Sequence, residues 1–150
     1  MNPDIELIYE TIGRLESSNI YVLLETFGID IHYTPQMIPH KRDSMIICCG
    51  NRKGIFIKPN PDPKYIEFLL WHEFGHYILH YKPYLKMNYK LSTFRDLYEQ
   101  QANIFAVFGL LHSVDLTDRK PVDAAVSLGV PPIIAADVFR TLAENRYTMR

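Results

Sequence analysis

Apolar positions change from helical to strand spacing along the first part of the chain. Apolar residues at mostly helical intervals predict an amphipathic helix over residues 3–17. Asn19 can cap a second short helix, which Gly28 would end. The alternation in IDIHY, residues 29–33, predicts a strand, and the apolar runs on either side of GNRKG predict a β-hairpin over residues 44–58.

Two longer helical patterns follow the hairpin. Asp62 as N-cap and Pro63 at the first helical position predict a helix that runs to Tyr81. Pro83 prevents much continuation, because proline removes a backbone donor and clashes with the preceding turn. After the loop KPYLKMNYKL, a second helix is predicted over about residues 94–112.

The C-terminal part carries two short helical patterns, near residues 122–128 and 132–145. The order of N-terminal helices, a small mostly antiparallel sheet and further helices predicts an α+β fold. A chain of 150 residues suffices for one hydrophobic core but hardly for two. We therefore expect a single domain over residues 1–150, with a core over 1–115 and a C-terminal helical extension over 116–150.

Composition limits the classes of protein that the chain can represent. Sixteen basic residues nearly balance seventeen acidic ones, so no overall field favours nucleic acid or an anionic membrane, and the run Lys41-Arg42 is interpreted as solvated loop charge. The N-terminus lacks a signal-peptide pattern, and prolines and polar residues interrupt the longest apolar run, residues 124–139. Cys48 and Cys49 are adjacent and form no disulfide framework. We expect a cytoplasmic protein that binds neither a membrane nor nucleic acid directly.

The helix predicted over residues 63–81 is apolar on nearly every side, which is typical of a buried helix. It contains the stretch WHEFGHYILH, with His72, Glu73 and His76 among its apolar residues. Burying an ionisable carboxylate is costly unless a proton, a partner or a cation compensates its charge. A compensating group is therefore expected beside Glu73.

The spacing of these three residues indicates a metal ion. His76 lies roughly 40° around the helix from His72 and one turn along it, so both imidazoles can reach one ion. Glu73 lies on the flank, where it can hold a metal-bound water. In this H-E-x-x-H pattern, zinc lowers the pKa of the water and the glutamate takes its proton. In a chain of this composition, about 0.01 matches to H-E-x-x-H are expected by chance. The alternative to a metal site is a pair of core histidines beside a glutamate whose hydrogen bonds are satisfied.

His80 extends the spacing to eight residues but is not expected to bind the ion. It lies roughly 80° around the helix from His72 and a further turn along, so a straight helix cannot easily bring all three rings to one ion. A metzincin would need glycine at position 79 and histidine at position 82, where this chain has Leu79 and Lys82. We interpret His80 as a residue at the helix end, or as one that contacts a ligand from outside.

The third ligand is expected from the helix predicted over residues 94–112. Glu99, Ala102, Asn103 and Ala106 fall on one stripe of it, and the small alanines would let the two helices pack closely and bring Glu99 to the metal. Asn103, one turn after Glu99, could hold a ligating histidine by its other ring nitrogen. Asp96 is the rival ligand, although a position in the first helical turn also explains this acidic residue.

Two long segments of the chain resemble the ImmA/IrrE family of metallopeptidases. GIFIKPNPDPKYIEFLLWHEFGHYILH has the family's strand and H-E-x-x-H helix, and YEQQANIFAVFGLL has its E-x-x-A-N-x-F-A helix. The resemblance covers about residues 45–112 and continues weakly into VSLGVPPIIAADVFRTL. It implies a zincin-like fold that binds Zn²⁺ through His72, His76 and Glu99, with Glu73 as general base.

The resemblance also implies a function. Members of the family are cytoplasmic proteases, often encoded by phages and other mobile elements, that cleave a helix-turn-helix repressor and so derepress genes. The chain departs from the family at Leu110–Ser113, which reads Leu-Leu-His-Ser where many members have Leu-Leu-Met-Pro. Gln101 stands where an acidic residue often precedes the alanine, which leaves Glu99 as the only glutamate able to serve.

Two other classes of function stay open from the sequence. The first is a metal-containing binding module that regulates a repressor by association without proteolysis. The second is a DNA-binding regulator that uses AVSLGVPPIIAADVFRTL as a helix-turn-helix. The second helix of that segment has one basic residue, Arg140, and two prolines at its start, which is poor for phosphate contacts.

Two features are candidates for substrate contacts. Tyr84 and Tyr89 lie between the two metal-binding helices and are candidates for stabilising an oxyanion. An edge strand of the hairpin, residues 44–49 or 54–58, could bind the substrate as an added strand.

Overall fold

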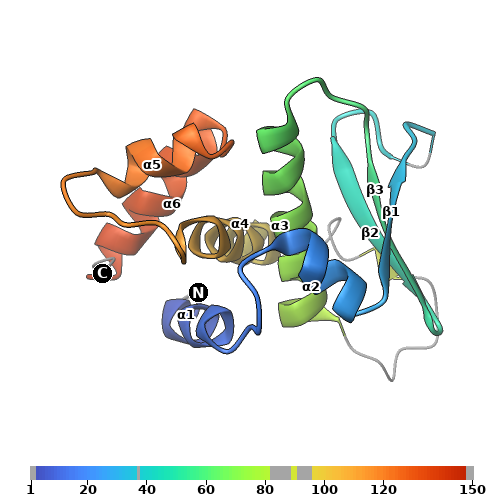
Figure 1. Cartoon of the computed structure of the whole chain (residues 1–150), viewed down its shortest axis with the longest axis horizontal. Helices are drawn as coiled ribbons and strands as arrows, with labels where there is room; N and C mark the ends of the chain where they lie inside the picture. Colours follow the sequence, from blue (N-terminus) through green and yellow to red (C-terminus); the bar gives the residue numbers. More distant parts are fainter. Residues whose placement is uncertain (1–2, 37, 82–88, 91–95, 148–150) are drawn as a thin grey trace.

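The computed structural model describes residues 3–36, 38–81, 89–90 and 96–147, without the side chains of residues 89, 90 and 96. This part of the chain has the α+β fold that the sequence predicts (Figure 1). Its helices and strands are α1 (Ile5–Gly13), α2 (Ile20–Thr26), β1 (Ile29–Tyr33), β2 (Ser44–Cys49), β3 (Arg52–Ile57), α3 (Pro63–His80), β4 (Tyr89–Lys90), α4 (Asp96–Leu111), α5 (Pro121–Ser127) and α6 (Pro132–Glu144).

Local capping explains where two of the helices begin. The Asn19 side chain accepts hydrogen bonds from the backbone N–H groups of the first turn of α2, and Asp62 does the same for Lys64 at the start of α3. The α1 helix is shorter than the predicted range 3–17. It ends at Gly13, and the following loop is stabilised by a hydrogen bond from the Asn19 backbone N–H to Ser17 Oγ.

The sheet is mixed, in the order β1-β3-β2-β4. β1 is parallel to β3, whereas β2 is antiparallel to both β3 and β4. Gly50, with φ 59°, begins the two-residue hairpin turn, so β3 starts at Arg52 rather than at Gly54. Since β3 pairs on both sides, the expectation that residues 54–58 could provide a free edge is wrong. The two described residues of β4 pair with Ile47 and Cys48 of β2.

The α3 helix lies between the sheet and α4 (Figure 1). Its apolar residues from Phe68 to Phe74 are buried, as the pattern predicts, whereas Ile66, Ile78 and Leu79 are partly buried. The largest fully buried side chains of the core include Phe68, Trp71, Phe74, Phe105 and Phe108. The two helices approach closely at two glycines. A Cβ on Gly75 would lie 2.9 Å from the Phe105 ring, and one on Gly109 would lie 2.4 Å from the Trp71 ring. This approach brings the N-terminal half of α4 beside the histidines of α3.

The C-terminal helices α5 and α6 pack against each other and against α4. Ala135, Val138 and Leu142 of α6 belong to the same cluster of buried residues as the apolar residues of α3. Whether residues 1–115 form a core with residues 116–150 as an extension stays a prediction. Among the described residues, no helix is long and apolar enough to cross a membrane.

Candidate metal centre

Three side chains from α3 and α4 converge on one point. One ligand atom each from His72, His76 and Glu99 lies within 4.8 Å of the other two. His72 Nε2 is 3.2 Å from Glu99 Oε2, and His76 Nε2 is 2.9 Å from Glu99 Oε1. Two imidazoles and one carboxylate with room for a further ligand form the donor set of a catalytic zinc site. The residues present therefore fit a divalent metal ion.

Glu99 is the carboxylate that the structure brings to the histidines. One of its carboxylate oxygens faces the His72 ring and the other faces the His76 ring, so a single residue contacts both histidines. Asp96, the rival from the sequence, is the first residue of α4, and its side chain lies outside the described part of the chain. That these residues bind a metal stays a prediction, although their arrangement favours Glu99.

The environment of the three residues favours a cation among them. Burial lowers the pKa of His76 to about 4, so its ring is neutral at neutral pH. Burial would raise the pKa of Glu99, but its contacts with His72 and His76 hold that pKa well below the usual range. Burial would also lower the pKa of His72, but Glu99 and the charge of Glu73 raise it. The ionised carboxylate of Glu99 and the neutral imidazole of His76 offer electron pairs to a positive ion, and the rise in the pKa of His72 shows that Glu99 and Glu73 make this point of the site negative.

Glu73 lies beside these three residues and has one free oxygen. Its side chain is 1% exposed, and Oε2 accepts a 2.7 Å hydrogen bond from Ser44 Oγ. Oε1 is buried and has no hydrogen-bond partner among the described residues. Burial raises the pKa of the Glu73 carboxyl, since the charged form loses its hydration. A buried carboxylate oxygen without a partner is suited to a water molecule or a proton, which is what a general base requires.

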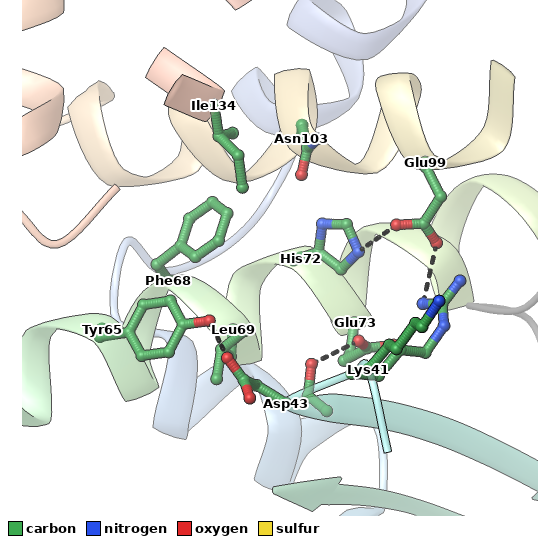
Figure 2. Close-up of a pocket in the computed structure, with 12 residues that line it drawn as sticks. Lys41, Asp43, Tyr65, Phe68, Leu69, His72, Glu73, Glu99, Asn103 and Ile134 are labelled. Carbon is green, nitrogen blue, oxygen red and sulfur yellow. Dashed lines mark hydrogen bonds and ion pairs between the residues drawn. The ribbon is translucent and has the colours of Figure 1, made fainter. Parts of the chain in front are cut away.

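Asn103 lies where it can contact a ligating histidine. Figure 2 shows its amide oxygen directed toward His72. In the described part of the chain, Asn103 Oδ1 and His72 Nδ1 are both buried without a hydrogen-bond partner, although Asn103 is close enough to raise the pKa of His72. The pair is placed as the sequence predicts, but the hydrogen bond itself is not formed.

His80 lies behind His76, on the side away from the other two residues. It is buried, and its Nδ1 is 2.9 Å from Nδ1 of His76. Its Nε2 is 2.8 Å from Oε1 of Gln101, and its ring stacks on Tyr98 with 3.9 Å between the ring centroids. His80 therefore contacts a candidate ligand from outside and does not join the converging group.

The centre opens into a cleft of about 230 Å³ (Figure 2). One wall is polar, with His72, Glu73 and Glu99. The other wall is largely apolar; it is formed by Tyr65, Phe68 and Leu69 of α3 and Ile134 of α6.

Two residues of the segment before and at the start of β2 were not found from the sequence. Arg42 Nη1 is 3.4 Å from Glu99 Oε1, so its interpretation as solvated loop charge is wrong. Ser44, the first residue of β2, donates to Glu73. No local signal indicates Ser44, because the first three residues of β2 are all buried and the strand has no alternation there that would mark an inward-facing position. Of the oxyanion candidates, Tyr84 and the side chain of Tyr89 lie outside the described residues.

Comparison with known proteins agrees with the geometry of the site. Residues 24–123, which are 100 of the chain's 150 residues, match the family model of the IrrE N-terminal-like domain of M78 peptidases. The match includes the sheet and both helices of the metal centre. No curated protein and no solved structure matches the chain. The family is metal-dependent and implies metallopeptidase activity. The chain therefore belongs to the IrrE N-terminal-like family, the ImmA/IrrE metallopeptidases that its motifs resemble.

Proposed function

We propose that the chain is a zinc-dependent endopeptidase of zincin-like fold that cleaves a helix-turn-helix repressor and so derepresses genes of a phage or mobile element. The observation that carries the peptidase function is the convergence of His72, His76 and Glu99 within 4.8 Å beside an open cleft. The free oxygen of Glu73 at the same place supplies the group that a hydrolase needs in addition to a metal.

The chain's own residues supply the proton transfers of the reaction. A zinc ion held by the two histidines and Glu99 would lower the pKa of a water molecule and polarise a peptide carbonyl. Glu73 takes the proton of the attacking water on Oε1 and passes it to the leaving amine nitrogen. Ser44 fixes the other oxygen of Glu73 and so orients the carboxylate toward the cleft. Arg42, which lines the cleft beside Glu99, adds a positive charge near the scissile carbonyl.

Within the described part of the chain, the first residues of β2 pair with a strand on one side only, which favours this segment as a place for an extended substrate. Ser44 to Ile46 pair with β3 on one side, and the described residues of β4 do not extend to them on the other. Ser44 also lines the cleft, so a substrate strand added along this edge would pass the metal centre. The apolar wall of Phe68, Leu69 and Ile134 suits an apolar side chain of the substrate next to the cleaved bond. We expect the cleaved segment to be extended or locally unfolded.

Membership of the ImmA/IrrE family supports the choice of a repressor as substrate. A cytoplasmic location agrees with the two free cysteines, Cys48 and Cys49.

The experiment that tests this function separates proteolysis from regulation by association. The chain and its Glu73→Gln variant are expressed with the repressor encoded beside the gene and a reporter that this repressor controls. We expect only the wild type to relieve repression and to shorten the repressor. Full relief by a zinc-loaded Glu73→Gln variant would show that the chain acts by binding alone.

A further inference from the structure

We propose that His80 and Gln101 are positioning residues, which hold the His76 ring with its Nε2 toward the metal and its Nδ1–H toward His80. The inference rests on the proposed role of His76 as a ligand. The orientation of this ligand is fixed by a line of hydrogen bonds that ends at the backbone carbonyl of Pro3, near the N-terminus.

The line of polar contacts is continuous over four residues. The Gln101 side chain donates from Nε2 to the Pro3 carbonyl oxygen at 3.2 Å. Gln101 Oε1 is 2.8 Å from His80 Nε2, and His80 Nδ1 is 2.9 Å from His76 Nδ1. The remaining nitrogen of His76, Nε2, faces Glu99 Oε1 at 2.9 Å, where the metal would bind. Each step is within hydrogen-bond distance.

Chemistry at the Pro3 end sets the direction of these hydrogen bonds. A carbonyl oxygen can only accept, so the amide nitrogen of Gln101 must face Pro3 and its oxygen must face His80. That oxygen in turn accepts from the Nε2–H of His80. The reversed amide would put two oxygens against each other at Pro3.

A metal bound to His76 requires the same direction of these hydrogen bonds. An imidazole that binds a metal through Nε2 keeps its proton on Nδ1, because a neutral ring has one N–H. With a metal on Nε2, the Nδ1–H of His76 would therefore donate to Nδ1 of His80, whose own proton is on Nε2 and points to Gln101. Both ends give one consistent arrangement, which leaves the electron pair of His76 Nε2 free for the metal.

Packing holds the line in place. His76 and His80 are 0% and 4% exposed, and the His80 ring lies 11° from parallel to the Tyr98 ring on which it stacks. His80 cannot turn away without leaving this stack and its contacts with His76 and Gln101. Burial and stacking therefore restrict rotation of both rings, and Nε2 of His76 faces the point where the metal would bind.

The test compares two substitutions of Gln101. Gln101→Met keeps the length of the side chain but removes the acceptor for His80, whereas Gln101→Glu keeps an oxygen there and loses the donor to Pro3. Gln100→Met is the matched control: it makes the same change one residue earlier and removes a hydrogen bond to Thr141 instead. Zinc affinity is measured on each full-length chain by competition with a chelator, and thermal unfolding of the metal-free chains reports on folding.

We expect Gln101→Met to weaken zinc binding by about 10-fold or more, as loss of a group that orients a ligand does in other metal sites. Gln101→Glu should bind zinc much more tightly than Gln101→Met, and Gln100→Met should bind it as the wild type does. In nitrogen NMR of the zinc-loaded chain, the Nδ1–H of His76 should exchange slowly with water in the wild type and faster in Gln101→Met.

Equal zinc affinity in the wild type and Gln101→Met, or equal losses in Gln101→Met and Gln101→Glu, would overturn the inference. None of these measurements needs proteolysis. A chain that binds zinc as described but cleaves no repressor would therefore contradict the proposed function and leave the inference standing.

Discussion

Ser44 Oγ donates a 2.7 Å hydrogen bond to Glu73 Oε2, across 29 residues of sequence. The bond joins the first residue of β2 to the proposed general base on α3. It fixes one carboxylate oxygen, while the other has no partner within the residues that the structure describes. The sheet therefore orients the carboxylate that is proposed to take the proton.

Ser44→Ala should reduce kcat by about 10-fold, since a hydrogen bond to a charged group contributes about 1.5–3 kcal/mol and a tenfold rate change corresponds to about 1.4 kcal/mol. KM and zinc affinity should change little, because Ser44 contacts neither His72, His76 nor Glu99. Steady-state kinetics on a repressor-derived peptide, with zinc titration as control, measure both. A variant with the wild-type kcat would show that Ser44 does not orient Glu73.

The pH dependence of the reaction should also move in Ser44→Ala. Burial raises the pKa of the Glu73 carboxyl, while the charge of His72 and the Ser44 hydrogen bond lower it. Removing the hydrogen bond therefore raises this pKa. A general base acts when it is deprotonated, so the acidic limb of the kcat/KM profile should shift to higher pH. A limb that stays in place or shifts to lower pH would contradict the assignment of that limb to Glu73.

Zinc binding should distinguish the two carboxylates of α4. Purified protein is expected to bind about one zinc per chain, and Glu99→Ala should weaken this binding far more than Asp96→Ala, since both oxygens of Glu99 face the histidines. Isothermal titration of the metal-free chains gives the comparison. Equal losses, or no loss in either variant, would refute the choice of Glu99.

The sequence predicts the features of this fold that depend on neighbouring residues. Asn19 and Asp62 cap their helices by contacts within one turn, and the spacing of His72 and His76 is a property of a single helix. Glu99 could be selected because its helix has one stripe of small residues that permits close packing.

Features that depend on contacts between distant segments of the chain could not be predicted from neighbouring residues. Arg42 looks like a loop charge until the segment before β2 is placed against α3 and α4. The parallel pairing of β1 with β3, and hence the interior position of β3, has no local signal either. Gln101 suggested only a departure from the family pattern, because its contacts with His80 and Pro3 join three separate parts of the chain.

The close approach of α3 and α4 should be necessary for stability. Gly109→Ala would place a Cβ 2.4 Å from the Trp71 ring, and such overpacking costs about 1–3 kcal/mol. Gly13→Ala is the control, because a Cβ at this position meets no atom within 4 Å. This substitution should leave the free energy of unfolding unchanged or raise it by up to about 1 kcal/mol. Urea unfolding of the metal-free chains measures both free energies. A Gly109→Ala variant as stable as the wild type would mean that the helices are not so tightly packed.

Cleavage of the repressor in a purified system tests the central claim most directly. The wild-type chain, loaded with zinc, is incubated with the repressor encoded beside its gene, and the products are identified by mass spectrometry. We predict two fragments from a single cut with the wild type, none after zinc is removed by a chelator, and none with a Glu73→Gln variant that still binds zinc. Fragments that appear at the same rate with Glu73→Gln, or an intact repressor with the zinc-loaded wild type, would contradict the account.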